Sequence, residues 1–226
     1  MQRGFWGSER GRREIEELAV RFPSLRFRLD DDGCALVSGT FEVAPAVGYT
    51  TKLEIPKRYP HDIPILHCDT AEIPWELDRH VITSNGHACL CARSEYRLHW
   101  GENDSLSDFI ERLVRPFFVG QFYFDTHSCW PPTGERSHGW KGIVEAYTEL
   151  CAPFGDASSE TILRLIRLLS RKHPPQGHEL CPCGSNRKLR DCHSEAVAKL
   201  RACVRSEDTA ADLNHLLHFK FAEHSD

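Results

Sequence analysis

The sequence predicts an α+β fold, with an N-terminal helix, a four-stranded antiparallel meander and several C-terminal helices. Three observations support this prediction: helical spacing of apolar residues near the start, alternating apolar residues across residues 25–68, and helical spacing again beyond Ser105. The chain has 226 residues and 40% hydrophobic content, which is enough to build a sizeable core.

Each element has a local pattern. Within residues 12–22, apolar side chains recur at i, i+3, i+4 and i+7, which is typical of a helix with one buried face. The Asp31-Asp32-Gly33 turn signal predicts an antiparallel hairpin. Two further strand-like stretches, YTTKLEIP and IPILHC, complete a meander from Leu25 to about Cys68.

The middle of the chain, residues 69–101, shows neither helical nor strand-like spacing of apolar residues and is rich in Gly, Pro, His and Asp. We therefore expect an ordered loop or a functional site there. A helix that Asp104 or Ser105 can cap follows, and further helices are expected near residues 140–151 and 158–171. Pro174, Pro175 and Gly177 then indicate a linker.

Composition limits the classes of partner and compartment. A net charge of -5 and a pI of about 6.2 give no general attraction to nucleic acid or anionic membranes, so neither is an expected partner. The chain has no apolar stretch of about 18 residues and no signal-peptide core, so we expect a cytoplasmic location. Its ten cysteines are then expected to be reduced, as ligands, nucleophiles or buried small residues.

The C-terminal stretch CPCGSNRKLRDCH contains two close pairs of metal-binding residues, separated by eight residues: Cys181, Cys183, Cys192 and His193. Three thiolates and one imidazole suit tetrahedral zinc. The stretch resembles the SEC-C family, whose pattern is Cys-Pro-Cys-Gly-Ser, a basic segment, then Cys with Cys or His. We therefore expect one structural zinc ion, without which so small a unit has too little core to fold. The alternative is a flexible tail with reduced side chains.

A second cysteine pair lies in NGHACLCARSEYRLHW, residues 85–100, and admits three interpretations. Cys89 and Cys91 are buried small residues, or one of them is a nucleophile, or they belong to a second zinc site with His80, His87 and His99. Cys-x-Cys alone is a weak metal signal.

The order of motifs around this stretch is similar to that of the ubiquitin-conjugating E2 (UBC) family over roughly residues 10–150. Three pieces carry the resemblance: Tyr59, Pro60 and Pro64; Asn85, Gly86, Cys89 and Leu90; Trp100, Ser105 and Leu106. The family's His-Pro-Asn is missing, because His80 lies nine residues before Cys89 and is followed by neither Pro nor Asn. In lacking this motif, the chain resembles the divergent prokaryotic E2-like proteins of antiviral operons.

The resemblance implies that Cys89 carries an acyl group as a thioester and passes it to an amine, with Cys91 as the reserve nucleophile. His80, His87 and His99 are candidates to raise the thiolate fraction, and Asn85, His80, His99 or a backbone N–H could stabilise the oxyanion.

The implied partners are an E1-like activating enzyme, a ubiquitin-like modifier or the C-terminus of a nucleotidyltransferase, and a protein acceptor. The alternative function is a catalytically inactive UBC/RWD-like binding module with a zinc tail. The predicted domains are an E2-like domain over residues 1–155, a helix and linker over 156–177, and a zinc module with C-terminal helices over 178–226.

Overall fold

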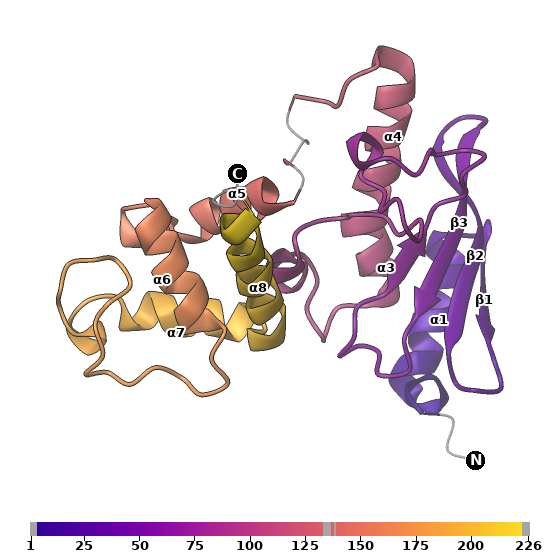
Figure 1. Cartoon of the computed structure of the whole chain (residues 1–226). Helices are drawn as coiled ribbons and strands as arrows, with labels where there is room; N and C mark the ends of the chain where they lie inside the picture. Colours follow the sequence, from indigo (N-terminus) through magenta and orange to yellow (C-terminus); the bar gives the residue numbers. More distant parts are fainter. Residues whose placement is uncertain (1–3, 133–136, 138, 223–226) are drawn as a thin grey trace. The chain divides into compact units, whose positions relative to one another are not determined.

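The chain divides into two compact units, shown in the computed structural model of Figure 1, which describes residues 4–132, 137 and 139–222. The first unit comprises Met1–Leu90 and Glu102–Glu135. The second comprises Cys91–Gly101 and Arg136–Asp226.

The first unit is built on a four-stranded antiparallel sheet. Its strands are β1 (Leu25–Leu29), β2 (Ala35–Ala44), β3 (Val47–Ile55) and β4 (Ile65–His67), and they lie side by side in chain order. The predicted meander and the α+β class are therefore confirmed. Only short connections are needed, because each strand pairs with the next one along the chain.

One face of this sheet is buried by helices. In β3 every second residue is buried, as expected for a strand with one face on the core. Phe41 of β2 packs against Phe22 at the end of α1 (Glu9–Arg21) and against Phe118 of α4 (Arg115–His127). Both helices thus contribute to the same aromatic cluster on this face.

A buried carboxylate joins α1 to the start of α3 (Leu106–Phe109). Glu14 is 4% exposed and accepts hydrogen bonds from Arg10 Nε at 2.9 Å, Tyr59 Oη at 2.6 Å and the Leu106 backbone N–H at 2.9 Å. The predicted cap is confirmed at Ser105, whose hydroxyl accepts from the third N–H of α3. From α3 the chain passes through a π-helical turn, Ile110–Val114, into α4.

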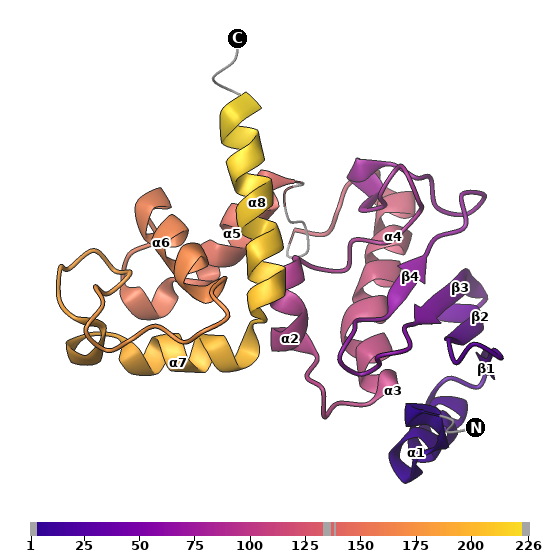
Figure 2. The same cartoon turned by 60° about the horizontal axis from the view of Figure 1, so that its bottom comes forward.

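The second unit is helical. It contains α2 (Tyr96–His99), α5 (Trp140–Leu150), α6 (Ser159–Leu169), α7 (Ser194–Cys203) and α8 (Ser206–Ala222) (Figure 2). The two helices expected near residues 140–151 and 158–171 are confirmed as α5 and α6.

The hydrophobic core of the second unit crosses both predicted domain boundaries, at residues 155 and 177. Tyr147 of α5 and Leu165 of α6 pack in the same cluster as Cys181 and Leu189 of the metal motif and Val197 of α7. The helical periodicity reveals the apolar face of α6 but not the element that covers it. The tail is therefore part of a larger unit with its own core.

Among the described residues, no helix combines the length and the apolar composition that crossing a membrane requires.

Replacing Tyr59 by Phe tests the carboxylate junction. The variant should lose about 1.5–3 kcal/mol of unfolding free energy, because it removes a buried hydrogen bond to a charged acceptor. Urea denaturation measures this loss. Tyr123→Phe on α4 is the matched control and should change the unfolding free energy by about 0.5 kcal/mol or less. Equal effects of the two substitutions would contradict the role assigned to Glu14.

Candidate functional site

The predicted nucleophile, Cys89, lies at the end of a short hairpin attached to the sheet. Val81 and Ala88 form an antiparallel bridge, and the His80 carbonyl accepts a hydrogen bond from the Cys89 backbone N–H at 2.7 Å. The second limb of the hairpin also pairs with β4, where the Ala88 N–H donates to the Leu66 carbonyl at 2.9 Å. The loop that precedes Cys89 is therefore an ordered extension of the sheet.

Asn85 and Gly86 form the tip of this hairpin. The side-chain oxygen of Asn85 accepts a hydrogen bond from the His87 N–H at 3.0 Å, which stabilises the turn. Gly86 has a φ of 69°, and a Cβ at this position would lie 2.4 Å from the Trp75 ring. The Asn-Gly pair thus has a structural role, and an oxyanion role for Asn85 would use its amide NH2 group.

Cys89 is exposed as a residue, but the immediate surroundings of its thiol do not favour the thiolate. Neighbouring protein atoms displace water from the thiol and raise its pKa above the ordinary value. A neighbouring imidazolium would produce the opposite shift. Burial, together with the neighbouring His67 ring, lowers the pKa of His87, which favours its neutral form.

The structure brings four of the predicted site residues onto one hairpin: His80, Asn85, His87 and Cys89. His80 has left-handed backbone geometry, with a φ of 52°, and its ring packs edge-on against Trp130 at 4.6 Å. Cys91 and His99 belong to the second unit, where His99 is the last residue of α2.

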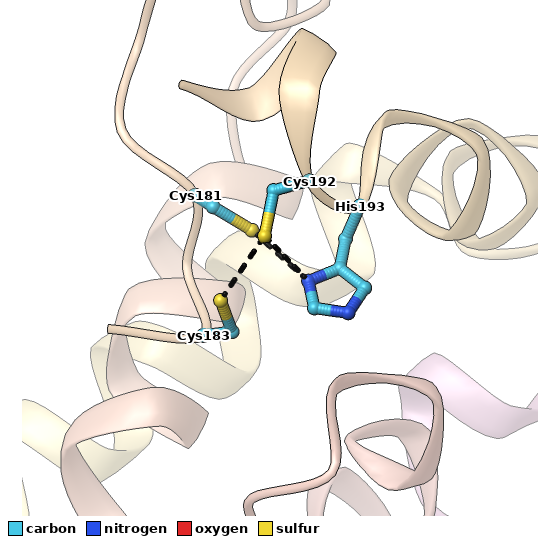
Figure 3. Close-up of side chains that lie close together, drawn as sticks. All are labelled: Cys181, Cys183, Cys192 and His193. Carbon is cyan, nitrogen blue, oxygen red and sulfur yellow. Dashed lines mark hydrogen bonds between the residues drawn. The ribbon is translucent and has the colours of Figure 1, made fainter. Parts of the chain in front are cut away.

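The C-terminal cysteines and histidine converge on one point (Figure 3). The Sγ atom of Cys192 lies 3.6 Å from Cys183 Sγ and 3.3 Å from His193 Nδ1, and Cys181 Sγ lies 3.3 Å from the same nitrogen. Tetrahedral zinc with ordinary bond lengths separates its ligand atoms by about 3.5–3.8 Å. The four side chains therefore fit a zinc ion in both chemistry and spacing.

The backbone explains how the two pairs of residues, which eight residues separate in the sequence, meet. The Cys181 N–H donates to the Arg187 carbonyl at 2.9 Å, which folds the chain back on itself. A 3-10 turn, Leu189–Asp191, then leads to Cys192, and His193 is the N-cap residue of α7.

Two thiols of the cluster have pKa values shifted in opposite directions, and burial raises the pKa of Cys181 to about 12. The pKa of Cys183 moves the other way. Burial alone would raise the pKa of Cys183, but hydrogen bonding with the side chain and backbone of Ser185 helps to lower it to about 6. The group is then mainly a thiolate at pH 7, which is the form that binds zinc.

Across the described parts of the chain, no other group of three or more His, Cys, Asp or Glu side chains has the spacing to hold an ion. The alternative of a second zinc site around Cys89 is therefore not supported.

In the comparisons with known proteins, only the C-terminal tail gives a match. The family model described as the SEC-C motif matches residues 179–195, which contain all four converging side chains. No curated protein and no solved structure matches the chain. The chain thus carries a SEC-C motif whose Cys/His cluster fits a zinc-binding tail.

The sequence interpretation missed the residues that contact the base of the hairpin. These are Arg79 in the loop, and Gln121, Asp125 and Trp130 in or just after α4. One signal was available, because Arg79 is the only Lys or Arg between residues 69 and 92. Its partners lie more than 40 residues away, so no local pattern identifies them.

Removing one ligand tests the metal centre. The purified protein should contain about one zinc per chain, and Cys192→Ala should lose it together with part of the helical circular dichroism. Zinc binding in small structural sites supplies roughly 10 kcal/mol or more, so the second unit should melt separately in the variant. Elemental analysis and thermal melts measure both effects.

Cys203→Ala is the matched control, because Cys203 is exposed and lies outside the cluster. It should retain the zinc content and the melting profile. A Cys192→Ala protein that keeps a full equivalent of zinc would contradict the assigned ligand set.

Proposed function

We propose that the protein is an E2-like carrier that holds an acyl group on Cys89 as a thioester and transfers it to an amine. The observation that carries this proposal is a cysteine, exposed as a residue, on a hairpin fixed to the sheet by backbone hydrogen bonds. The chain order of meander, Asn-Gly-containing hairpin and Ser105-capped helix supports it further.

The transfer consists of two acyl exchanges. The Cys89 sulfur attacks the carbonyl carbon of a donor thioester, and the donor thiol leaves with a proton as the new C–S bond replaces the old one. An amine then attacks the Cys89 thioester, forms an amide and releases the thiol. Sulfur suits both steps, because a thiolate is a strong nucleophile and a thioester remains reactive towards amines.

The raised pKa of Cys89 adds a requirement to the first step. Most of the thiol is protonated at pH 7, so a base has to accept its proton. His87 is the candidate within the hairpin, because its lowered pKa keeps the ring neutral and able to accept a proton. Asn85 and the backbone N–H groups of the hairpin are the candidate oxyanion donors.

In this proposal the metal site has a structural role. Three thiolates and one imidazole complete a tetrahedral zinc shell and leave no coordination position for a substrate. The side chains that surround the cluster belong to the core of the second unit, so the ion would fasten the motif to that core.

The proposed partners follow from the chemistry. A thioester donor is an E1-like activating enzyme, and the acyl group is the C-terminus of a ubiquitin-like modifier or of a nucleotidyltransferase. The acceptor is an amine on a protein. We further propose that the protein acts in the cytoplasm, within a bacterial antiviral conjugation operon.

A non-catalytic binding module on the same fold is the second candidate. The observation that favours it is the group of exposed apolar side chains near the hairpin: Trp75, Leu77 and Ile82 are 38%, 53% and 37% exposed. Such side chains could serve protein binding without any transfer. The absence of His-Pro-Asn from the sequence fits this candidate as well.

An adduct assay separates the two candidates. Incubation with the products of neighbouring genes and ATP should give a wild-type adduct that thiol reagents cleave and Cys89→Ala abolishes. Cys89→Ser should give an oxygen ester that resists thiols and is cleaved by base. Non-reducing gels and mass spectrometry identify these products.

Cys91→Ala and Cys129→Ala are the controls and should keep the adduct. If the adduct persists in Cys89→Ala and is lost in Cys91→Ala, the nucleophile has been assigned to the wrong residue. If none of the proteins forms an adduct under these conditions, the binding-module candidate is favoured.

A further inference from the structure

Three consecutive carbonyl groups at the base of the hairpin are each held by a different donor. The Asp78 carbonyl accepts from the Trp130 indole N–H at 2.7 Å, and the Arg79 carbonyl accepts from the Gln121 side-chain amide at 2.6 Å. The His80 carbonyl accepts from the Cys89 backbone N–H at 2.7 Å. The backbone that holds Cys89 is thus itself fixed by α4 and by the segment that follows α4.

The contact with Gln121 is reciprocal. Gln121 donates to the carbonyl of Arg79, and its side-chain oxygen accepts from Arg79 Nε at 2.8 Å. Gln121 is 0% exposed and Arg79 is 7% exposed, so water does not compete effectively for these bonds.

The guanidinium group of Arg79 is held by further side chains. It contacts the carboxylate of Asp125 and lies 4.5 Å above the Phe124 ring. Asp125 also accepts a hydrogen bond from the Tyr49 hydroxyl of β3 at 2.7 Å. The loop is therefore connected through α4 to the sheet.

The backbone of His80 needs such support. A residue other than glycine with a positive φ is strained by roughly 1 kcal/mol or more and persists where its surroundings hold it. Trp130 packs on the His80 ring, and it can reach this position because residue 120 is a glycine. A Cβ at Gly120 would lie 2.3 Å from the Trp130 ring.

We propose that Gln121 and Trp130 are positioning residues for Cys89. By holding the carbonyls that precede the hairpin, they fix the backbone from which Cys89 presents its sulfur. The inference rests on the proposed transfer function, in which this sulfur has to meet the donor carbonyl in a defined geometry. A displacement of about 1 Å can lower the rate of such a step by up to about a hundredfold.

Two variants remove the donors separately. Trp130→Phe deletes the indole N–H but keeps an aromatic ring beside His80, and Trp130 is only partly buried, so the fold should survive. Gln121→Glu keeps an acceptor for Arg79 Nε and deletes the donor to the Arg79 carbonyl. Thr126→Ala is the matched control on α4, because the Thr126 hydroxyl bonds to the Phe122 carbonyl of the same helix.

The first measurement separates kcat from KM for thioester formation on Cys89. Trp130→Phe should lower kcat about tenfold and leave KM within about twofold, because the partner still binds but the sulfur is misplaced. Thr126→Ala should leave both parameters unchanged.

The second measurement follows alkylation of Cys89 by iodoacetamide against pH, with peptide mass spectrometry to resolve it from the other cysteines. Release of the hairpin should admit water to the thiol and move the midpoint of alkylation to lower pH. A loss of global stability alone would not move this midpoint as long as the protein remains folded. A thermal melt verifies that each variant is folded at the assay temperature.

Alkylation needs no partner protein, so the two proposals can fail separately. Absence of a thioester in the wild type would contradict the transfer function, and the alkylation profile would still test the positioning role. If folded Trp130→Phe and Gln121→Glu both match Thr126→Ala in alkylation midpoint and rate, the positioning role is overturned.

Discussion

The hydrogen bond from the Cys89 N–H to the His80 carbonyl is the constraint on which the proposed site depends. It closes the hairpin that carries the Asn-Gly turn and fixes the backbone at the exposed cysteine. The hairpin pairs with β4 on one side, and α4 holds the preceding carbonyls on the other. A thiol on an otherwise irregular loop thereby acquires a defined position, which acyl transfer between proteins requires.

The cysteines of the C-terminal cluster and of the hairpin have different surroundings. Cys183 has a lowered pKa and lies in a cluster of four Cys and His side chains that fits a zinc ion. Cys89 has a raised pKa and a surface position, and it lies outside any metal-binding group of the described residues. The proton of Cys89 thus becomes part of the proposed reaction, because the protein surroundings do not remove it in advance.

Local patterns in the sequence predicted the elements well and their long-range partners poorly. Apolar periodicity located α1, the four strands, α5 and α6, because each pattern lies within a short segment. The cysteine spacing located the C-terminal Cys/His cluster for the same reason. The core that joins α5 and α6 to the motif and the contacts of Arg79 with α4 depend on tertiary packing. The direction of the Cys89 pKa shift also depends on packing, which is why the expected imidazolium effect was not found.

The central claim is that Cys89 carries the acyl group while the C-terminal cysteines bind zinc. Its most direct test is to measure the alkylation of each cysteine with and without a zinc chelator. In the zinc-loaded protein, Cys89 should be alkylated while Cys181, Cys183 and Cys192 are protected. The chelator should expose these three thiols and leave the rate at Cys89 unchanged. Protection of Cys89 that the chelator relieves would make it a metal ligand and contradict its assignment as the acyl carrier.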